Sequence, residues 1–245
     1  MKTIIVIPAR MASSRFPNKP MALINNKPMI AHVWERAIKA DIGPVIVACC
    51  EEEVSSCIKS LGGDVMLTDP NIPSGTDRVY EAIKNMDLFQ TLDSIINLQG
   101  DMPLIDPGTI KYVNSPIIQG FDISTLATSF SNENEKKNIN VTKVEVRWIT
   151  RNKMGEALDF NKDINNINNE GLFHHVGIYG FTPNALKQFV NLPPSKREIK
   201  LKLEQMRALD NKMKIGVSYV KNIPISVDTK DDLVHAENIL NKNEK

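Results

Sequence analysis

The basic residues Arg10, Arg15 and Lys19 are almost evenly spaced along a loop near the start of the chain, and the first acidic residue is Glu35. Guanidinium groups bind phosphate oxygens through paired hydrogen bonds, whereas a lysine ammonium supplies a compact positive charge. Together the three groups are suited to a polyanion the size of a nucleoside triphosphate. The alternative is a solvated basic loop, which the charge pattern alone does not exclude.

A second candidate group is the sequence Gln99-Gly100-Asp101, which follows a strand predicted at residues 94–98. An aspartate directly after a buried strand lies at the edge of the sheet where open α/β proteins bind ligands. A carboxylate that faces a triphosphate needs a cation between them, and Mg²⁺ is the usual choice among cations with oxygen ligands. The alternative is a turn aspartate ahead of a helix that starts near Pro107.

A third group, Ser74 to Arg78, precedes a helical pattern of apolar residues. Ser74 and Asp77 have the spacing of a helix capping box, which explains both as structural residues. Arg78 has no such explanation, because a cation in the first turn opposes the helix dipole. A nearby anion would account for it.

Apolar patterns predict the elements that position these groups. Residues 4–7 are four consecutive aliphatics, typical of a strand buried on both faces, and Pro8 ends its ladder because it has no N–H to donate. Strands at 45–48 and 65–67 alternate with helices at 28–38, starting with Pro28, and at 51–61, closed by two glycines. This order predicts βαβ units and a parallel sheet.

The second half of the chain has a different pattern. Residues 141–148 alternate between apolar and polar types, which is typical of a half-exposed antiparallel strand, and residues 157–160 are its expected partner. The other elements that we expect are strands at 121–128, 173–181 and 215–220, a surface loop at 131–140, a helix from Pro183 to 190, one helix at 197–209 with a surface pair of Glu198 and Lys202, and a capping box of Thr229 and Asp232.

Composition excludes several classes of protein. The 245 residues are 42% hydrophobic and 24% charged with a net charge of +1, so a broad basic face for nucleic acid is not expected. No apolar run reaches the roughly 20 residues that span a bilayer, and we expect a cytoplasmic protein with no membrane partner. Cys49, Cys50 and Cys57 lack metal-ligand spacing and are interpreted as reduced thiols.

Five motifs, in order along the chain, carry a resemblance to a known family: IPARMASSRFPNKP at 7–20, SGTDR at 74–78, QGDMPLI at 99–105, HVGIYGF at 175–181 and LEQMR at 203–207. They resemble the sugar-acid cytidylyltransferases, most closely the 3-deoxy-manno-octulosonate (Kdo) branch, the CMP-Kdo synthetases. The resemblance implies an α/β fold of the nucleotide-diphospho-sugar transferase type, in which a Rossmann-like, mostly parallel sheet carries a small antiparallel lobe. It also implies a single domain over residues 1–245, a dimerisation lobe at about 141–181 and a homodimer.

The resemblance further implies a reaction and its residues. CTP and Kdo would give CMP-Kdo and pyrophosphate for lipopolysaccharide synthesis, with Mg²⁺ as cofactor. The implied CTP-binding residues are Pro8, Ala9, Arg10, Arg15, Lys19, Ser74 and Gln99. The implied sugar-binding residues are Arg78, Lys162, His175, Tyr179, Glu204 and Gln205. Asp101 and Asp228 would bind metal, and with Arg10 and Lys19 they form the catalytic set.

The chain departs from the family pattern at four positions: Asn18, Met102, Asp159 and Lys162. Lysine in place of arginine at position 162 is the change that bears most on the sugar, because an ammonium is a weaker partner than a guanidinium fork for a carboxylate. Two alternatives therefore remain open. One is a cytidylyltransferase for another sugar acid, of the 8-amino-Kdo or sialic-acid type. The other is a non-catalytic nucleotide-binding regulator.

Overall fold

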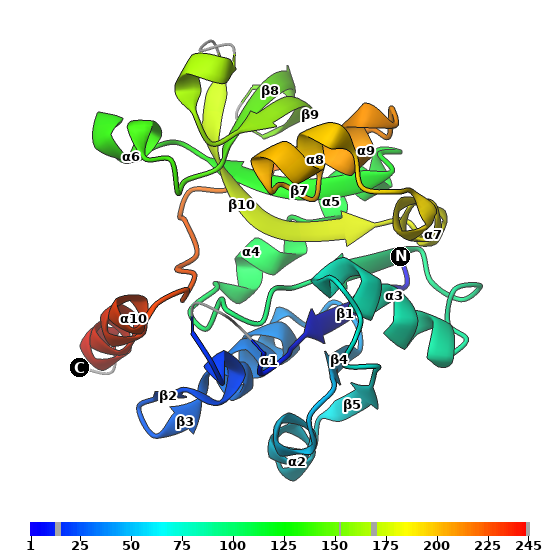
Figure 1. Cartoon of the computed structure of the whole chain (residues 1–245), viewed down its shortest axis with the longest axis vertical. Coiled ribbons are helices and arrows are strands. Elements are labelled where there is room, and N and C mark those ends of the chain that lie inside the picture. Colours follow the sequence, from blue (N-terminus) through cyan, green and yellow to red (C-terminus); the bar gives the residue numbers. More distant parts are fainter. Residues whose placement is uncertain (13–15, 152, 168–170, 244–245) are drawn as a thin grey trace. The chain divides into compact units, whose positions relative to one another are not determined.

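The computed structural model describes residues 1–12, 16–151, 153–167 and 171–243. Its contacts divide the chain into two compact units, Met1–Lys111 with Pro224–Lys245, and Tyr112–Ile223 (Figure 1). The C-terminal segment therefore belongs to the first unit.

Four parallel strands form the sheet of the first unit in the order β5-β4-β1-β6. Their bounds are Thr3–Pro8 for β1, Val45–Cys49 for β4, Asp64–Leu67 for β5 and Ser94–Asn97 for β6. In β1, Ile4 to Ile7 are at most 1% exposed. Burying one such side chain stabilises the fold by roughly 1.5–3 kcal/mol. The parallel sheet predicted from the aliphatic runs is confirmed.

The helices of this unit follow the predicted alternation. They are α1 (Met29–Ala40), α2 (Glu52–Ser60), α3 (Gly75–Asn85), α4 (Pro107–Lys111) and α10 (Lys230–Asn243), with the 3₁₀ turn η1 (Lys19–Met21) and the hairpin of β2 (Leu23–Ile24) and β3 (Lys27–Pro28). Pro28 was expected as the first helical residue, which is wrong. Its ψ of 140° is extended, so it caps α1 from outside.

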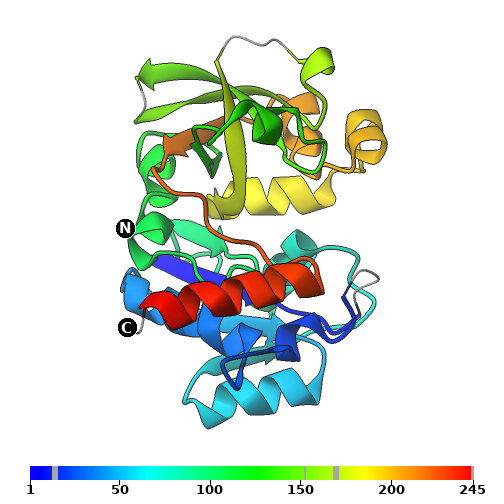
Figure 2. The same cartoon turned by 90° about the vertical axis from the view of Figure 1, so that its left-hand side faces the viewer.

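Helix α10 holds the C-terminal segment against the start of the chain. Ala236 and Leu240 lie in one apolar cluster with Phe16, Ile24 and Met29, and Figure 2 shows α10, in red, along the blue segment that contains β2, β3 and α1. The N–H of Thr229 donates to the Asp232 carboxylate at 2.8 Å, and the N–H of Asp232 donates to the Thr229 hydroxyl at 3.2 Å. The predicted capping box of Thr229 and Asp232 is therefore confirmed. This packing fixes the residues directly before α10, among them Asp228.

The second unit contains a mixed sheet in which β10 lies between β7 and β8, and β11 lies between β7 and β9. Among the strand pairs described in this unit, only β7 and β11 run parallel. The predicted antiparallel partnership of β8 and β9 is confirmed. The strands are β7 (Ile123–Thr128), β8 (Lys143–Thr150), β9 (Met154–Asn161), β10 (Leu172–Phe181) and β11 (Ile215–Tyr219). The helices are α5 (Asn114–Ile118), α6 (Glu133–Lys137), η2 (Ile164–Asn166), α7 (Pro183–Asn191), α8 (Lys196–Leu201) and α9 (Met206–Asp210).

Two element predictions in the second unit are wrong. The single helix expected at 197–209 is two short helices, because Lys202 adopts a left-handed φ of 53° that ends α8. Glu198 pairs with Arg207, at 2.6 Å, and not with Lys202. The surface loop expected at 131–140 contains the short helix α6, which Asn132 caps through its side chain.

The structure confirms the predicted fold class, an α/β fold with a mostly parallel sheet and a small antiparallel lobe. Within the described ranges, no helix is long and apolar enough to cross a membrane.

Candidate active site

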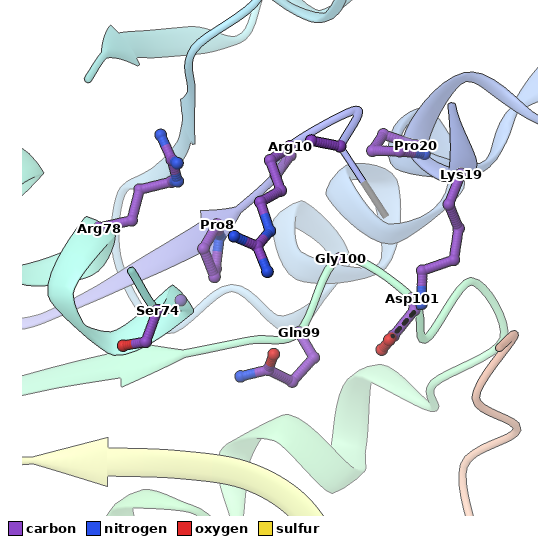
Figure 3. A pocket seen from close by; sticks show the side chains of 12 residues that line it. Pro8, Arg10, Lys19, Pro20, Ser74, Arg78, Gln99, Gly100 and Asp101 are labelled. Atoms are coloured by element: carbon purple, nitrogen blue, oxygen red, sulfur yellow. Dashed lines mark hydrogen bonds and ion pairs between the residues drawn. The ribbon is translucent and has the colours of Figure 1, made fainter. Parts of the chain in front are cut away.

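A pocket of about 340 Å³ opens at the carboxyl ends of β1 and β6 in the first unit. It is lined by Pro8, Ala9, Arg10, Ala12, Lys19, Pro20, Ser74, Gly75, Arg78, Gln99, Gly100 and Asp101. Six of the seven predicted CTP-binding residues are therefore brought together. The seventh, Arg15, lies outside the described residues. In Figure 3 the side chains of Arg10 and Lys19 point toward Gln99 and Asp101.

Local backbone chemistry assembles this pocket. The N–H of Ala9 donates to Ala48 O at 2.9 Å, so the basic loop begins directly where the ladder of β1 ends. A Cβ on Gly100 would lie 3.0 Å from Pro8 O. Glycine lets the turn after β6 approach β1 this closely, whereas a side chain would require the turn or β1 to shift slightly. Ser74 caps α3, with its Oγ accepting from Asp77 N at 3.1 Å, and so faces the same pocket from a third element.

The Lys19 ammonium joins the two predicted metal-binding aspartates. Its Nζ lies 2.8 Å from Asp101 Oδ2 and 3.3 Å from Asp228 Oδ1. Asp101 and Asp228 are 127 positions apart in the sequence. They meet here because the N–H of Val227, the residue before Asp228, donates to Asp101 O at 2.8 Å. Asp228 therefore lies beside the pocket that Lys19 and Asp101 line.

These two carboxylates fit a hard divalent cation. In the part of the chain that the structure describes, no group of three or more His, Cys, Asp or Glu side chains could hold a metal ion. Mg²⁺ typically takes only one or two protein carboxylates and completes its shell with substrate phosphates and water. The pair of aspartates at the edge of a phosphate-sized pocket suits that pattern of ligands.

Glu51 is a site residue that the sequence did not reveal. Its Oε1 accepts a hydrogen bond from Met11 N at 2.9 Å, so a carboxylate at the end of β4 holds the backbone of the basic loop. Its Oε2 is buried and has no hydrogen-bond partner among the described residues. In the sequence Glu51 is the first residue of a predicted helix, and no local signal links it to a loop 40 residues earlier.

We expect Glu51→Ala to raise the KM for CTP about tenfold, because a lost hydrogen bond to a charged group is worth roughly 1.5–3 kcal/mol. Glu51→Gln keeps an oxygen acceptor for Met11 N and serves as the matched control, with a much smaller effect. Steady-state kinetics with both substrates varied measures this. An unchanged KM for CTP in Glu51→Ala would show that the loop needs no such support.

Arg78 is only 2% exposed, although it belongs to the pocket lining. Its guanidinium donates to Thr68 Oγ1 and, at 3.4 Å, to Asp69 O. Its Nη2 is buried without a hydrogen-bond partner among the described residues. In Figure 3 the guanidinium points away from Gln99 and Asp101. The contacts identify Arg78 as a link between α3 and the end of β5, and its predicted contact with a sugar acid stays a prediction.

His175 is held within the second unit by a threonine that the sequence did not single out. Thr125 Oγ1 lies 2.9 Å from His175 Nε2, and also within 3.1 Å of two backbone carbonyls, those of Val176 and Ile178. The threonine proton is needed by these carbonyls, since they can only accept. We infer that Nε2 carries the imidazole proton and that Nδ1 is an acceptor, suited to a substrate hydroxyl.

Burial, with a contribution from the charge of His174, lowers the pKa of His175 to about 3. The unfolded chain therefore takes up this proton near pH 6.5, whereas the folded protein does so only near pH 3. Stability due to the neutral imidazole is present above pH 6.5 and is lost as the pH falls toward 3.

We expect the unfolding free energy of the wild type to fall by about 3 kcal/mol more than that of His175→Gln between pH 7 and pH 4. Gln can still donate to Thr125, and the carboxylates that titrate in both proteins cancel in the comparison. Urea unfolding at the two pH values measures this. Parallel pH profiles for the two proteins would contradict it.

Tyr179 lies beside His175, and Glu204 and Gln205 are two further predicted sugar contacts in the second unit. The rings of His175 and Tyr179 have centroids 5.6 Å apart. Burial raises the pKa of the Tyr179 hydroxyl, and the negative charge of Glu204 raises it further, so the phenol stays a hydrogen-bond donor. Gln205 is 7% exposed and its Nε2 has no hydrogen-bond partner in the described parts of the chain. Glu204 and Gln205 lie on the turn between α8 and α9 and not on a helix.

Three positions that depart from the family pattern have different surroundings. Met102 is buried, at 6% exposed, and is not among the described residues that line the pocket. Asp159 pairs with Arg197 at the surface of the second unit. The backbone oxygen of Lys162 accepts from Lys143 Nζ at 2.7 Å, which fixes the main chain at the predicted sugar contact.

Comparisons with known proteins give the family. The cytidylyltransferase family profile matches residues 4–215. The 3-deoxy-manno-octulosonate cytidylyltransferase of Paramagnetospirillum magneticum is 44% identical over 238 residues, which cover 97% of both chains. The chain belongs to the 3-deoxy-manno-octulosonate cytidylyltransferase family. The enzyme of the same name from Brucella suis is 41% identical over 96% of this chain and 94% of its own.

Solved structures agree with this family. A CMP-2-keto-3-deoxy-manno-octonic acid synthetase complexed with CTP matches with a TM-score of 0.89 and 31% identity, over 99% of this chain and 100% of the other. A UDP-glucose pyrophosphorylase complexed with UDP-glucose matches with a TM-score of 0.74 at 15% identity, over 99% of this chain and 100% of its own, a likeness of fold alone. The predicted family and fold type are thus confirmed.

Proposed function

We propose that this enzyme transfers the cytidylyl group of CTP to the anomeric hydroxyl of Kdo, giving CMP-Kdo and pyrophosphate. The observation that carries the proposal is one pocket in which Arg10 and Lys19 meet Gln99 and Asp101 at the carboxyl edge of the parallel sheet. The family supports the same reaction, because its curated relatives are named for Kdo and a structural neighbour was solved with CTP.

In this proposal the pocket binds CTP through the elements that build it. Arg10 and Lys19, with Arg15, would neutralise the triphosphate, and Ser74 and Gln99 would donate to or accept from the base. Pro8 and Ala9 shape the floor, since β1 ends there. The sugar hydroxyl would attack the α-phosphorus in line with the departing pyrophosphate. Fixed positive groups then stabilise the charge that develops on the phosphoryl oxygens.

Mg²⁺ is part of the proposal, with Asp101 and Asp228 as its protein ligands. When bound, the cation would neutralise phosphate charge and polarise the reacting oxygens. To bind the cation, the chain must hold both carboxylates at one edge of the pocket. The hydrogen bond from Val227 N–H to Asp101 O keeps the two segments that carry them together.

The contacts to the sugar acid that we propose from the family resemblance are Arg78, Lys162, His175, Tyr179, Glu204 and Gln205. The neutral imidazole of His175 accepts from a hydroxyl and the phenol of Tyr179 donates to one. Lys162 supplies positive charge for a carboxylate, without the fork of an arginine.

Substrate choice can be tested by coupled pyrophosphate release with CTP and three sugar acids: Kdo, its 8-amino analogue and a sialic acid. A polar site disfavours the wrong ligand by leaving its own groups unpaired. We expect kcat/KM to be highest for Kdo. If either competitor exceeds Kdo by about tenfold or more, roughly 1.4 kcal/mol, the departures at Asp159 and Lys162 have changed the specificity.

The cellular part of the proposal is a homodimer with a dimerisation lobe at about 141–181, in the cytoplasm, that supplies CMP-Kdo for lipopolysaccharide synthesis. The antiparallel pair of β8 and β9 supports the lobe, since it carries exposed apolar side chains at Ile149 and Leu158. Sedimentation of the purified protein tests the dimer.

A further inference from the structure

The feature that the proposed function does not explain is the position of the Lys19 side chain. A lysine expected to bind phosphate instead contacts the two aspartates expected to bind metal, at 2.8 and 3.3 Å. Figure 3 marks the contact with Asp101. The side chains of Lys19 and Asp101 are only 17% and 23% exposed, so solvent screens this pair less than a surface ion pair.

The chemistry of these contacts makes the ammonium and a divalent cation compete. Both need the oxygens Asp101 Oδ2 and Asp228 Oδ1, which already point at Lys19 Nζ. A divalent cation held by both carboxylates would also lie next to the Lys19 ammonium. The two positive groups would repel each other by a few kcal/mol at the effective dielectric of a protein surface, about 20.

The backbone on either side of the contact is fixed. Asp101 is tied to Val227 through its carbonyl, and Lys19 opens the 3₁₀ turn η1, whose N–H groups at Met21 and Ala22 bond to Asn18 O and Lys19 O. The lysine side chain has four rotatable bonds, so it can exchange partners without a change in these backbone contacts.

We propose that Lys19 is an exchangeable counter-ion that couples metal binding to nucleotide binding. This inference rests on the proposed function. Without nucleotide, Lys19 neutralises Asp101 and Asp228 and holds the affinity for a divalent cation low. When the triphosphate arrives, the ammonium moves to phosphate oxygens and frees both carboxylates for the cation. Metal and CTP therefore bind cooperatively, each raising the affinity for the other.

The test measures metal binding without nucleotide, by titration of Mn²⁺ followed by electron paramagnetic resonance. We expect Lys19→Met, which keeps the length of the side chain and removes its charge, to bind Mn²⁺ about tenfold or more tightly than the wild type. Lys19→Arg keeps the charge, and Arg10→Met removes a different cation of the same pocket while the contact of Lys19 with the two aspartates is kept. Both should bind Mn²⁺ within about threefold of the wild type.

A second titration, with CTP and no metal, separates the coupling from the proposed function. Lys19→Met should bind CTP about tenfold more weakly, because it loses a charge-assisted contact to phosphate. If wild type binds no CTP, the proposed function fails and the Mn²⁺ comparison still stands. If Lys19→Met binds Mn²⁺ no more tightly than wild type, or Arg10→Met tightens it equally, Lys19 is not the counter-ion. Circular dichroism checks that each variant folds, and Lys19→Gln replaces Lys19→Met if it does not.

Discussion

Replacing Asp101 by Asn should reduce turnover about 100-fold or more while the fold is kept, because it removes the negative charge of a proposed metal ligand at the edge of the pocket. Asp101 directly follows the turn after β6, and its carboxylate is partly exposed in the pocket. Its backbone carbonyl, which accepts from Val227, is unchanged by the substitution. Pyrophosphate release at saturating Mg²⁺ and both substrates gives the turnover, and circular dichroism gives the fold.

Asp106→Asn is the matched control for this experiment. Asp106 lies five residues later on the same segment, and is not one of the described residues that line the pocket. Asn can replace it beside the start of α4, because an amide oxygen also caps helices. We expect Asp106→Asn to keep full activity. A turnover of Asp101→Asn within about threefold of wild type, less than 1 kcal/mol in activation free energy, would exclude the metal assignment.

Lys143→Met should destabilise the protein by about 3 kcal/mol or more, because it removes the buried charged donor of three backbone carbonyl oxygens. Lys143 is 0% exposed, and its Nζ donates to the backbone oxygens of Asn138, Val141 and Lys162 at 2.6 to 2.9 Å. Three acceptors require three N–H donors, which only the charged ammonium has. Burial lowers the pKa of Lys143, and the negative charge of Asp163 opposes this.

Urea unfolding compares Lys143→Met with Lys137→Met, in which an exposed lysine of α6 is replaced. We expect the control to remain within about 0.5 kcal/mol of wild type, as is usual for surface substitutions. We also expect the KM for the sugar acid to rise in Lys143→Met, since Lys143 fixes the main chain at Lys162. A loss below about 1 kcal/mol would mean that water or a backbone shift satisfies the three carbonyls.

The parts of the site that sequence reasoning predicted are those encoded locally. Ile4 to Ile7 define β1, Pro8 ends it, and the basic loop must follow at the ligand edge of the sheet. The same reasoning placed Asp101 at the end of β6 and Ser74 at the start of α3. Each of these positions depends on a strand end or a helix cap, which a few neighbouring residues determine.

The parts that were missed depend on contacts between distant segments. Glu51 supports Met11 across 40 residues, and Thr125 orients His175 across 50 residues through a β-bulge between Val176 and Tyr179. Sequence spacing carries no sign of either. The single helix expected at 197–209 failed for a local reason, because the apolar period continues through Lys202 although the backbone there is left-handed.

Cytidylyl transfer from CTP to Kdo can be followed through the phosphorus atoms of CTP. The protein is incubated with Mg²⁺, Kdo and CTP labelled at either the α- or the γ-phosphate, and the products are separated. We expect the α label in the sugar nucleotide and the γ label in pyrophosphate, in equal amounts. Appearance of the γ label on the sugar, or binding of CTP with no product, would contradict it.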